Sequence, residues 1–304
     1  MTDSTRVILE KYQVRKTAKQ KNAFIEYMQK LAADMGYTLK VEKGSFGAKN
    51  LVVGDISRSK VVYSAHYDTA PVLPFPNFIT PKNFAVYLLY NAVVILAFAA
   101  IAMLVGVVCN MLSFGSEATV RAVQATYIVL LALILAGPAN KRTANDNTSG
   151  VTLLIDIMRE LPPEKRDEVA FVFFDLEEAG LLGSWAFAKA HKTQMRDKPL
   201  VNFDCVADGD HILIMPRKGA TVYCKAFETA FAEKDGFKVE VVKKGTFYPS
   251  DQANFSRGVG VAALNSTKGG LLYLSRIHTS RDVVYREENI EFLKNGAISL
   301  VDLI

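Results

Sequence analysis

The 304-residue chain has few cysteines and contains two long stretches without any charge. Its three cysteines, Cys109, Cys205 and Cys224, are scattered, which excludes a disulfide framework and favours a reducing compartment. The chain also lacks an internal repeat and low-complexity tracts. No charged residue occurs from Asn83 to Ser116 or from Ala122 to Asn140, although charged residues make up 22% of the whole. The surplus of apolar residues is therefore confined to one region.

These two charge-free runs are long enough to cross a lipid bilayer. They contain 34 and 19 residues, against the roughly 20 that a membrane helix needs. We therefore predict an inserted transmembrane hairpin over residues 81–139, with spans at about 84–108 and 122–139 and a turn in SFGSEATVR. The alternative is a buried helical hairpin inside a soluble protein or dimer.

The charges around the hairpin predict its orientation. Lys82, Lys141 and Arg142 flank it on the side of the main domain, against Arg121 in the turn, and the positive-inside rule then places the main domain in the cytoplasm. The N-terminal segment has no apolar core of a signal peptide, so the first span is expected to direct insertion. We expect the bilayer as a partner, and an oligomer through the hairpin is open; no nucleic acid is expected.

Outside the insert, short apolar runs alternate with helical periodicity. We expect a helix over residues 5–36 and two strands at 50–55 and 60–68, paired as a hairpin or as neighbours. Beyond residue 150 the expected helices cover 151–161, 179–192, 221–236 and the end from about 287, and the expected strands cover 168–175, 199–204, 211–216 and 258–265. This pattern predicts a three-layer α/β/α domain, residues 1–80 and 140–304, around a mixed, mostly parallel sheet.

Polar residues with metal-binding side chains follow the expected strands. Open α/β sheets bind their ligands at the carboxyl ends of the strands. Two histidines and several carboxylates in such places suit a pair of divalent ions such as zinc, with one carboxylate bridging the ions over a shared water. The candidates are His66, Asp68, Asp146, Glu177, Glu178, Asp204 and His278.

Six short motifs in order resemble one family of enzymes. The stretches HYD, NDNTSG, EEAGLLGS, the aspartate after VNF, SDQANF and IHTSRD together resemble the M28 metallopeptidases, which are dizinc aminopeptidases. The resemblance covers roughly residues 20–75 and 140–304. The M20 and M42 families share the His-x-Asp and Glu-Glu features, but DNTSG and IHTSRD fit M28 better.

The resemblance implies a set of ligands for two Zn²⁺ ions. His66 and Asp204 would hold one ion, Glu178 and His278 the other, and Asp146 would bridge them. Each ion then has three protein ligands and an open position, as a catalytic site requires.

Two further acids have roles implied by the same resemblance. Glu177 would be the general base, taking a proton from the attacking water and delivering it to the leaving amine. Asp68 would accept the other ring N–H of His66 and fix its tautomer.

One expected feature of the family is missing. Many members have a tyrosine directly before the last histidine as an oxyanion stabiliser, where this chain has Ile277. Tyr248 is the main substitute, since a phenol can donate to a developing alkoxide, and Arg276 is another. Three remaining residues with metal-binding side chains, His191, His211 and Cys205, are not assigned to metal.

The resulting prediction is a membrane-anchored zinc aminopeptidase that removes N-terminal residues from peptides with a free N-terminus. One alternative is a glutaminyl-cyclase-like enzyme with a single zinc. Another is a catalytically idle membrane binding protein with a peptidase-like domain. Because the hairpin is inserted between His66 and Asp146, we expect the site to lie close to the bilayer surface.

Overall fold

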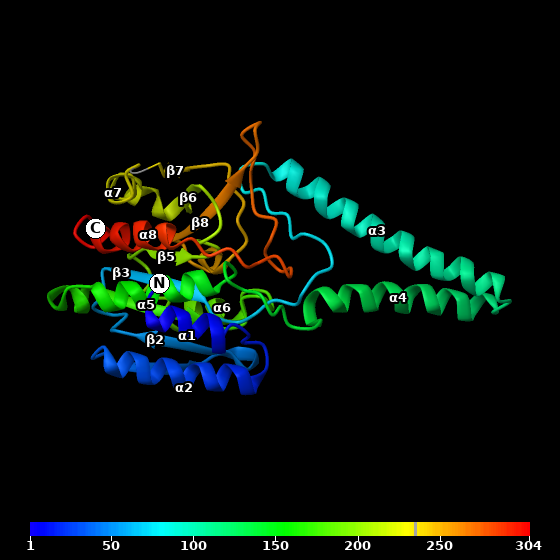
Figure 1. Cartoon of the computed structure of the whole chain (residues 1–304), viewed down its shortest axis with the longest axis horizontal. Coiled ribbons are helices and arrows are strands. Elements are labelled where there is room, and N and C mark those ends of the chain that lie inside the picture. The colour runs from blue at the N-terminus through cyan, green and yellow to red at the C-terminus, as the bar shows by residue number, and fades with distance from the viewer. Residues whose placement is uncertain (234–235) are drawn as a thin grey trace.

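The computed structural model describes residues 1–233 and 236–304, and Figure 1 shows an α/β domain from which two long helices project. The α-helices are α1 (Asp3–Lys11), α2 (Ala18–Asp34), α3 (Phe84–Met111), α4 (Ser116–Ala136), α5 (Thr148–Glu160), α6 (Leu182–Ala190), α7 (Cys224–Ala230) and α8 (Glu287–Leu300). The strands are β1 (Leu39–Lys43), β2 (Lys49–Val53), β3 (Val61–His66), β4 (Val169–Phe174), β5 (Leu200–Phe203), β6 (His211–Pro216), β7 (Lys238–Val241), β8 (Gly258–Ser266) and β9 (Leu272–Tyr273).

The strands form one mixed sheet in the order β1-β2-β4-β3-β5-β8-β6-β7, with β9 paired to the end of β8. Its four central strands, β4, β3, β5 and β8, run parallel, whereas β2 and β6 join this centre antiparallel. The parallel centre brings four strand ends to the same edge of the sheet. The predicted α/β fold with a mixed, mostly parallel sheet is confirmed in this respect.

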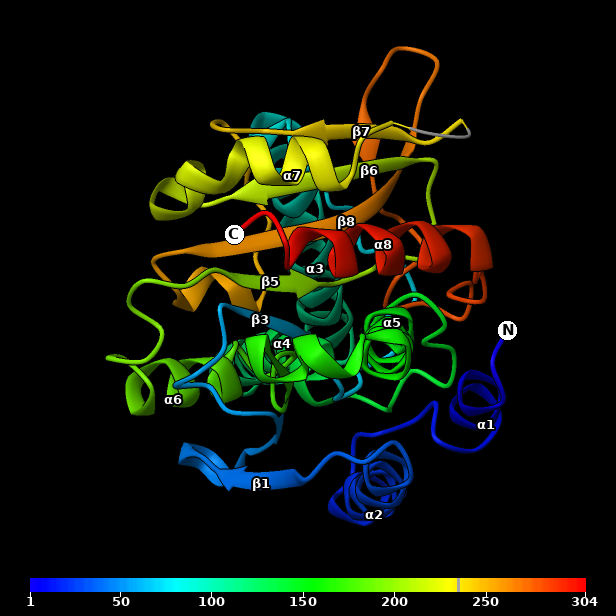
Figure 2. The ribbon, with the colours of Figure 1, turned by 90° about the vertical axis from the view of Figure 1, so that its left-hand side faces the viewer.

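Both faces of the sheet are covered, and the central strand β4 is apolar at every position. Along β4, Phe171 and Phe173 enter a core formed with α1, α2, α5, α7 and α8, while Val172 and Phe174 enter a second core with α6. Figure 2 shows α5, α7 and α8 lying over the sheet. Each such side chain contributes about 1.5–3 kcal/mol when fully buried, so a continuous apolar run is stable here and an alternating one would not be.

Two expectations about the N-terminal third are wrong. The helix expected over 5–36 is two helices, α1 and α2, because the chain turns at residues 12–17 and buries Arg15 there. The expected stop at Gly36 is correct for α2: this glycine follows the helix in the left-handed conformation, with φ 80°. The strands β2 and β3 are not neighbours: β4 lies between them and pairs with both. A strand in the interior of a sheet forms hydrogen bonds with a neighbour on each side. The strand β4 has β2 on one side and β3 on the other.

The helices α3 and α4 form an antiparallel hairpin that leaves the domain (Figure 1). They pack on each other through small residues: a Cβ added at Gly106 would lie 2.9 Å from Val123 Cγ2. Most of their other apolar side chains are exposed, for example Leu96 at 67% and Leu135 at 69%. Both helices are long and apolar enough to cross a membrane, which by itself is weak evidence.

The two limbs of this insertion lie side by side at the edge of the sheet. The backbone N–H of Val72 donates to Pro138 O at 2.8 Å, and that of Asn140 donates to Ala70 O at 2.9 Å. The chain therefore leaves and returns at nearly the same place, so the insertion does not disturb the strand order.

Candidate functional site

The candidate residues surround one small cavity at the carboxyl ends of the parallel strands. His66 is the last residue of β3, Asp204 follows β5, and Glu177 and Glu178 lie in the turn after β4. The cavity has a volume of about 180 Å³. The residues that line this catalytic cavity are His66, Asn77, Ile79, Tyr87, Asp146, Glu177, Glu178, Asp204, Cys205, Tyr248, Pro249, Ile277 and His278.

Asp146 lies between the two histidines. Its Oδ1 is 3.2 Å from His66 Nε2, and its Oδ2 is 3.0 Å from His278 Nε2. The carboxylate is 5% exposed. Each oxygen therefore faces a different half of the cavity.

Each half of the cavity contains a second carboxylate. His66 Nε2 is 3.7 Å from Asp204 Oδ1, and His278 Nε2 is 3.3 Å from Glu178 Oε2. Ligand atoms of His66, Asp146 and Glu178 lie within 4.8 Å of one another, as do those of His66, Glu177 and Asp204. The five residues expected to hold metal are therefore together.

Asp68 links His66 to the glutamate turn. Its Oδ1 lies 3.5 Å from His66 Nδ1 and accepts the backbone N–H of Glu177 at 3.0 Å, while its Oδ2 accepts that of Glu178 at 3.2 Å. Leu176, just before the two glutamates, has φ 56°. The buried carboxylate of Asp68 thus holds the turn of the two glutamates in place and lies beside the ring of His66, whose Nδ1 has no hydrogen-bond partner among the described residues.

Burial and the neighbouring charges strongly shift the pKa values of the acids and histidines in the cavity. Burial raises the pKa of Glu177 well above its usual range and also raises the pKa of Glu178. Burial lowers the pKa of His66, but the nearby carboxylates, Glu177 first, outweigh it, so the net pKa is raised well above 6.5. For His278 the carboxylates of Glu178 and Asp146 likewise outweigh burial. A positive charge among these buried carboxylates would therefore stabilise their ionised forms.

The donor set fits a pair of divalent cations. Four carboxylates converge with only two imidazoles, and Glu178 Oε1 is buried without a hydrogen-bond partner among the described residues. Imidazole and carboxylate ligands suit zinc. An unpartnered buried carboxylate oxygen costs free energy unless a cation compensates for it.

The two proposed oxyanion stabilisers differ in position. Tyr248 lines the cavity and donates its O–H to Asp204 O at 3.1 Å. The guanidinium of Arg276 instead binds both oxygens of Asp208, at 2.6 and 2.7 Å. Of the two, only Tyr248 is at the catalytic cavity.

Of the three residues that we did not assign to metal, two lie outside the catalytic cavity and one lines it. His191 and His211 lie outside the cavity, beside Glu42 and Glu240. Cys205 faces the cluster, although alternation along a strand would turn the residue after Asp204 to the opposite face. It lies beyond the end of β5 with φ 59°, and its Sγ donates to Asp204 Oδ1 at 3.1 Å. Burial raises the pKa of this thiol well above its usual range, which favours a protonated donor.

Sequence reasoning gave no role to several residues that shape the site. Asp282 accepts the backbone N–H of Asn145 at 2.8 Å and of Asp146 at 3.0 Å. Asp251 is fully buried beside the cluster, and burial raises its pKa to about 7. Both stand in motifs that we quoted, IHTSRD and SDQANF, which is the signal that pointed to them.

Asn77 carried no such signal. Its Nδ2 lies 3.3 Å from His278 Nδ1, and it comes from the proline-rich segment that leads into α3. With Ile79 and Tyr87, it makes the insertion one wall of the catalytic cavity.

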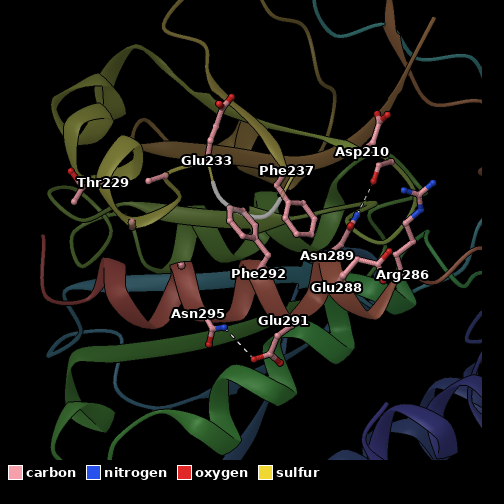
Figure 3. Close-up of a pocket in the computed structure, with 15 residues that line it drawn as sticks. Asp210, Thr229, Glu233, Phe237, Arg286, Glu288, Asn289, Glu291, Phe292 and Asn295 are labelled. Atoms are coloured by element: carbon pink, nitrogen blue, oxygen red, sulfur yellow. Dashed lines mark hydrogen bonds between the residues drawn. The ribbon is translucent and has the colours of Figure 1, made fainter.

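A larger cavity lies elsewhere, between α7 and α8 (Figure 3). It has a volume of about 730 Å³ and contains Asp210, Glu233, Glu288 and Glu291 beside Phe292, but no histidine. Because it shares no lining residue with the catalytic cavity, its size does not make it the site of the chemistry.

A family model for peptidase family M28 matches residues 124–300, which is more than half of the chain. The chain belongs to peptidase family M28. The matched range of this M28 chain includes Asp146, Glu177, Glu178, Asp204 and His278, while His66 and Asp68 precede it. Members of this family usually bind zinc, and the clustered side chains offer metal-binding groups. No relative was found among curated protein sequences.

Solved structures share the fold of this M28 chain at low sequence identity. The LapA aminopeptidase of Legionella pneumophila has a TM-score of 0.61 at 13% identity, over 98% of this chain and 67% of its own. A glutaminyl cyclase of Fimbriiglobus ruber has a TM-score of 0.57 at 12% identity, over 99% of this chain and 95% of its own. The likeness therefore shows the fold, which an aminopeptidase and a cyclase share.

Proposed function

We propose that this protein is a membrane-anchored aminopeptidase with two zinc ions. The observation that carries the proposal is the position of Asp146, whose two oxygens face His66 and His278 at 3.2 and 3.0 Å. A carboxylate with a different imidazole at each oxygen suits two cations rather than one. His66 and Asp204 would hold one ion and Glu178 and His278 the other, with Asp146 shared.

When bound, two such ions would polarise the scissile carbonyl and lower the pKa of a water held between them. Glu177 lines the same cavity and has a pKa raised by burial, so it can accept a proton from the attacking water and deliver it to the leaving amine. Asp68 keeps the turn of Glu177 in place through its backbone N–H. Tyr248 is the donor that we assign to the developing oxyanion; its single O–H donates to Asp204 O in the structure and would have to turn from that oxygen to the oxyanion.

The second candidate function is that of a glutaminyl cyclase. It is favoured by the Fimbriiglobus ruber enzyme, whose fold this chain matches over 95% of that enzyme's length. A single-zinc enzyme would leave one half of the cavity, with its own histidine and carboxylate, without a cation. The paired arrangement therefore favours the peptidase.

One experiment separates these functions. The full chain is purified in detergent, its metal is counted, and it is given a peptide with a free N-terminus, the same peptide N-acetylated, and a peptide that begins with glutamine. Two zinc ions with cleavage of the free peptide alone support the aminopeptidase. One zinc with pyroglutamate formation supports the cyclase, and no turnover with either supports an idle binding protein.

Membrane anchoring is proposed from the exposed apolar surface of α3 and α4. Helices of 28 and 21 residues are about 42 and 32 Å long at 1.5 Å per residue, against a hydrocarbon core of about 30 Å. Because α4 begins at Ser116 and ends at Ala136, part of the expected turn is helical and the expected span of 122–139 is three residues too long; Glu117 and Arg121 in its first two turns would lie at the membrane surface. So large an exposed apolar surface is rare in soluble monomers. Lys82, Lys141 and Arg142 at the base of the hairpin, against Arg121 at its other end, support a cytoplasmic domain under the positive-inside rule.

Replacing residues 84–136 by a short Gly/Ser linker is expected to release the protein from the membrane. The limbs at Val72 and Pro138 remain paired, so the domain can still fold. Carbonate extraction and detergent phase partitioning measure the effect. A control variant with Gly/Ser only at 112–115 keeps both helices and should remain in the membrane. A full-length chain that stays in the aqueous phase would contradict anchoring; protease protection in vesicles tests the side.

The metal-free protein is expected to lose stability as pH rises above about 4, through about 7 for the pKa of Asp251 and from about 6.5 upward for the pKa values of the two histidines. His66, His278, Glu177 and Asp251 all have pKa values raised by folding, that of Asp251 to about 7. A raised pKa stabilises the folded state below the unfolded pKa, and this contribution disappears as pH rises through the folded pKa.

Zinc should stabilise the protein increasingly over the same range, because its ligands must lose protons to bind it. Thermal unfolding with a chelator and with zinc, at several pH values, measures both trends. A melting temperature of the chelated protein that stays level or rises with pH would contradict the charge balance described for the cavity.

A further inference from the structure

A second pocket adjoins the catalytic cavity and has the opposite charge. It has a volume of about 750 Å³ and lies between the end of β6 and the segment after β7. It shares Tyr248 and Pro249 with the catalytic cavity, and Leu181, which closes the turn of Glu177, forms part of its wall. The two spaces therefore border the same segment of the chain, Tyr248 and Pro249.

Four basic side chains line this pocket, and none of its lining residues is acidic. Two of the four already have partners: Arg217 donates to Ala253 O at 2.6 Å, and Lys243 pairs with Glu228 at 3.2 Å. Lys218 and Lys244 are exposed at the rim. These two are the groups that can turn toward a bound anion.

The volumes of the catalytic cavity and of the second pocket suit different parts of a peptide substrate. At about 180 Å³ the catalytic cavity is smaller than the roughly 300–1,000 Å³ of pockets that enclose drug-sized ligands. It has room for a terminal residue but not for the peptide that follows. The pocket of about 750 Å³ next to it is the adjoining space for that remainder.

We propose that the pocket of Lys218 and Lys244 binds a carboxylate of the peptide, one or two residues beyond the scissile bond. This rests on the proposed aminopeptidase function. A short peptide has its free N-terminus at one end and a carboxylate at the other, and the four basic side chains that line the pocket match the charge of the carboxylate. The carboxylate is either the C-terminus of a di- or tripeptide or the side chain of an aspartate or glutamate.

Three tripeptides test the proposal and separate the two sources: Leu-Gly-Gly, Leu-Gly-Gly amide and Leu-Asp-Gly amide. Either carboxylate peptide should exceed the neutral amide about 2- to 30-fold in kcat/KM, through KM, which is the range that two exposed ion pairs supply. Preference for Leu-Gly-Gly indicates a terminal carboxylate, and preference for Leu-Asp-Gly amide indicates a side chain. The preference should weaken as salt is added.

The variant Lys218→Gln/Lys244→Gln should remove this preference and leave kcat for the neutral amide unchanged. Lys218→Arg/Lys244→Arg should retain it. Lys40→Gln is the matched control, an exposed lysine on β1 at the far edge of the sheet. Equal KM values for acid and amide in the wild-type chain would overturn the proposal.

Two further outcomes are distinguishable. If no peptide is hydrolysed, the proposed function fails, and calorimetry of Leu-Gly-Gly and its amide on the Glu177→Gln chain still tests the pocket: equal affinity overturns it. Vesicles of phosphatidylcholine with and without phosphatidylglycerol test a lipid headgroup. Binding that depends on Lys218 and Lys244 and on the anionic lipid, with unchanged peptide preference, overturns the proposal.

Discussion

Replacing Glu177 by Gln is expected to lower kcat for peptide hydrolysis by about 10²–10⁴-fold, the usual contribution of a positioned acid–base group. The amide has nearly the shape of the carboxylate but cannot accept a proton. Its backbone N–H still reaches Asp68, so the turn should remain in place. KM should change little, since the side chain acts on the proton and not on the peptide.

Metal counting makes this result specific. Glu177→Gln should retain two zinc ions, because Glu178 still faces His278, and in the half of the cavity that Glu177 shares, His66 still has Asp146 and Asp204 beside it. Glu164→Gln is the matched control, an exposed glutamate far from the cavity whose change should leave kcat as it is. Activity within a few-fold of wild type would remove Glu177 from the role of base. Loss of zinc together with activity would instead place it among the ligands.

The parts of the fold that the sequence predicts well are those that depend on local patterns. Short apolar runs predicted strands at 168–175 and 211–216. In the structure, β4 lies at 169–174 and β6 at 211–216. Which strands pair is not local. The short separation of β2 and β3 suggested neighbours, but β4, more than one hundred residues further on, enters between them.

The candidate site shows the same division. Residues at strand ends were predictable because a parallel sheet brings those ends to one edge. The direction of the Cys205 side chain was not predictable from strand alternation, because this residue lies two positions beyond the end of β5, with φ 59°. Asn77 was not predictable, since nothing in a proline-rich segment indicates that it reaches His278, 201 residues away.

The inserted helix α3 contributes a residue to the lining of the catalytic cavity. Tyr87 of α3 lines the catalytic cavity and packs on Phe247, with ring centroids 5.3 Å apart. Phe247 in turn lines the basic pocket. A helix that we propose to lie in the membrane is thus in contact with both parts of the proposed binding region, which supports a site near the bilayer surface.

Asp146→Asn is expected to have the largest effect of any single substitution at the site. The carboxylate lies between two imidazoles, and its pKa is lowered because the hydrogen bonds and charges of His278 and His66 outweigh burial. Asparagine keeps the size but offers one acceptor oxygen and no charge, so it can serve one half of the cavity at most. Bound zinc should fall from two ions to one or none.

Hydrolysis should then fall by more than about 10³-fold, because the loss of the shared ligand removes both the polarised carbonyl and the activated water. Metal analysis after dialysis and single-turnover rates at saturating peptide measure the two effects separately. Asp302→Asn, an exposed aspartate beside Lys165, is the control and should retain both ions. A variant with two zinc ions and normal turnover would contradict bridging by Asp146. One zinc with normal turnover would mean that a single ion suffices, and the cyclase-like arrangement would then be the better description of this site.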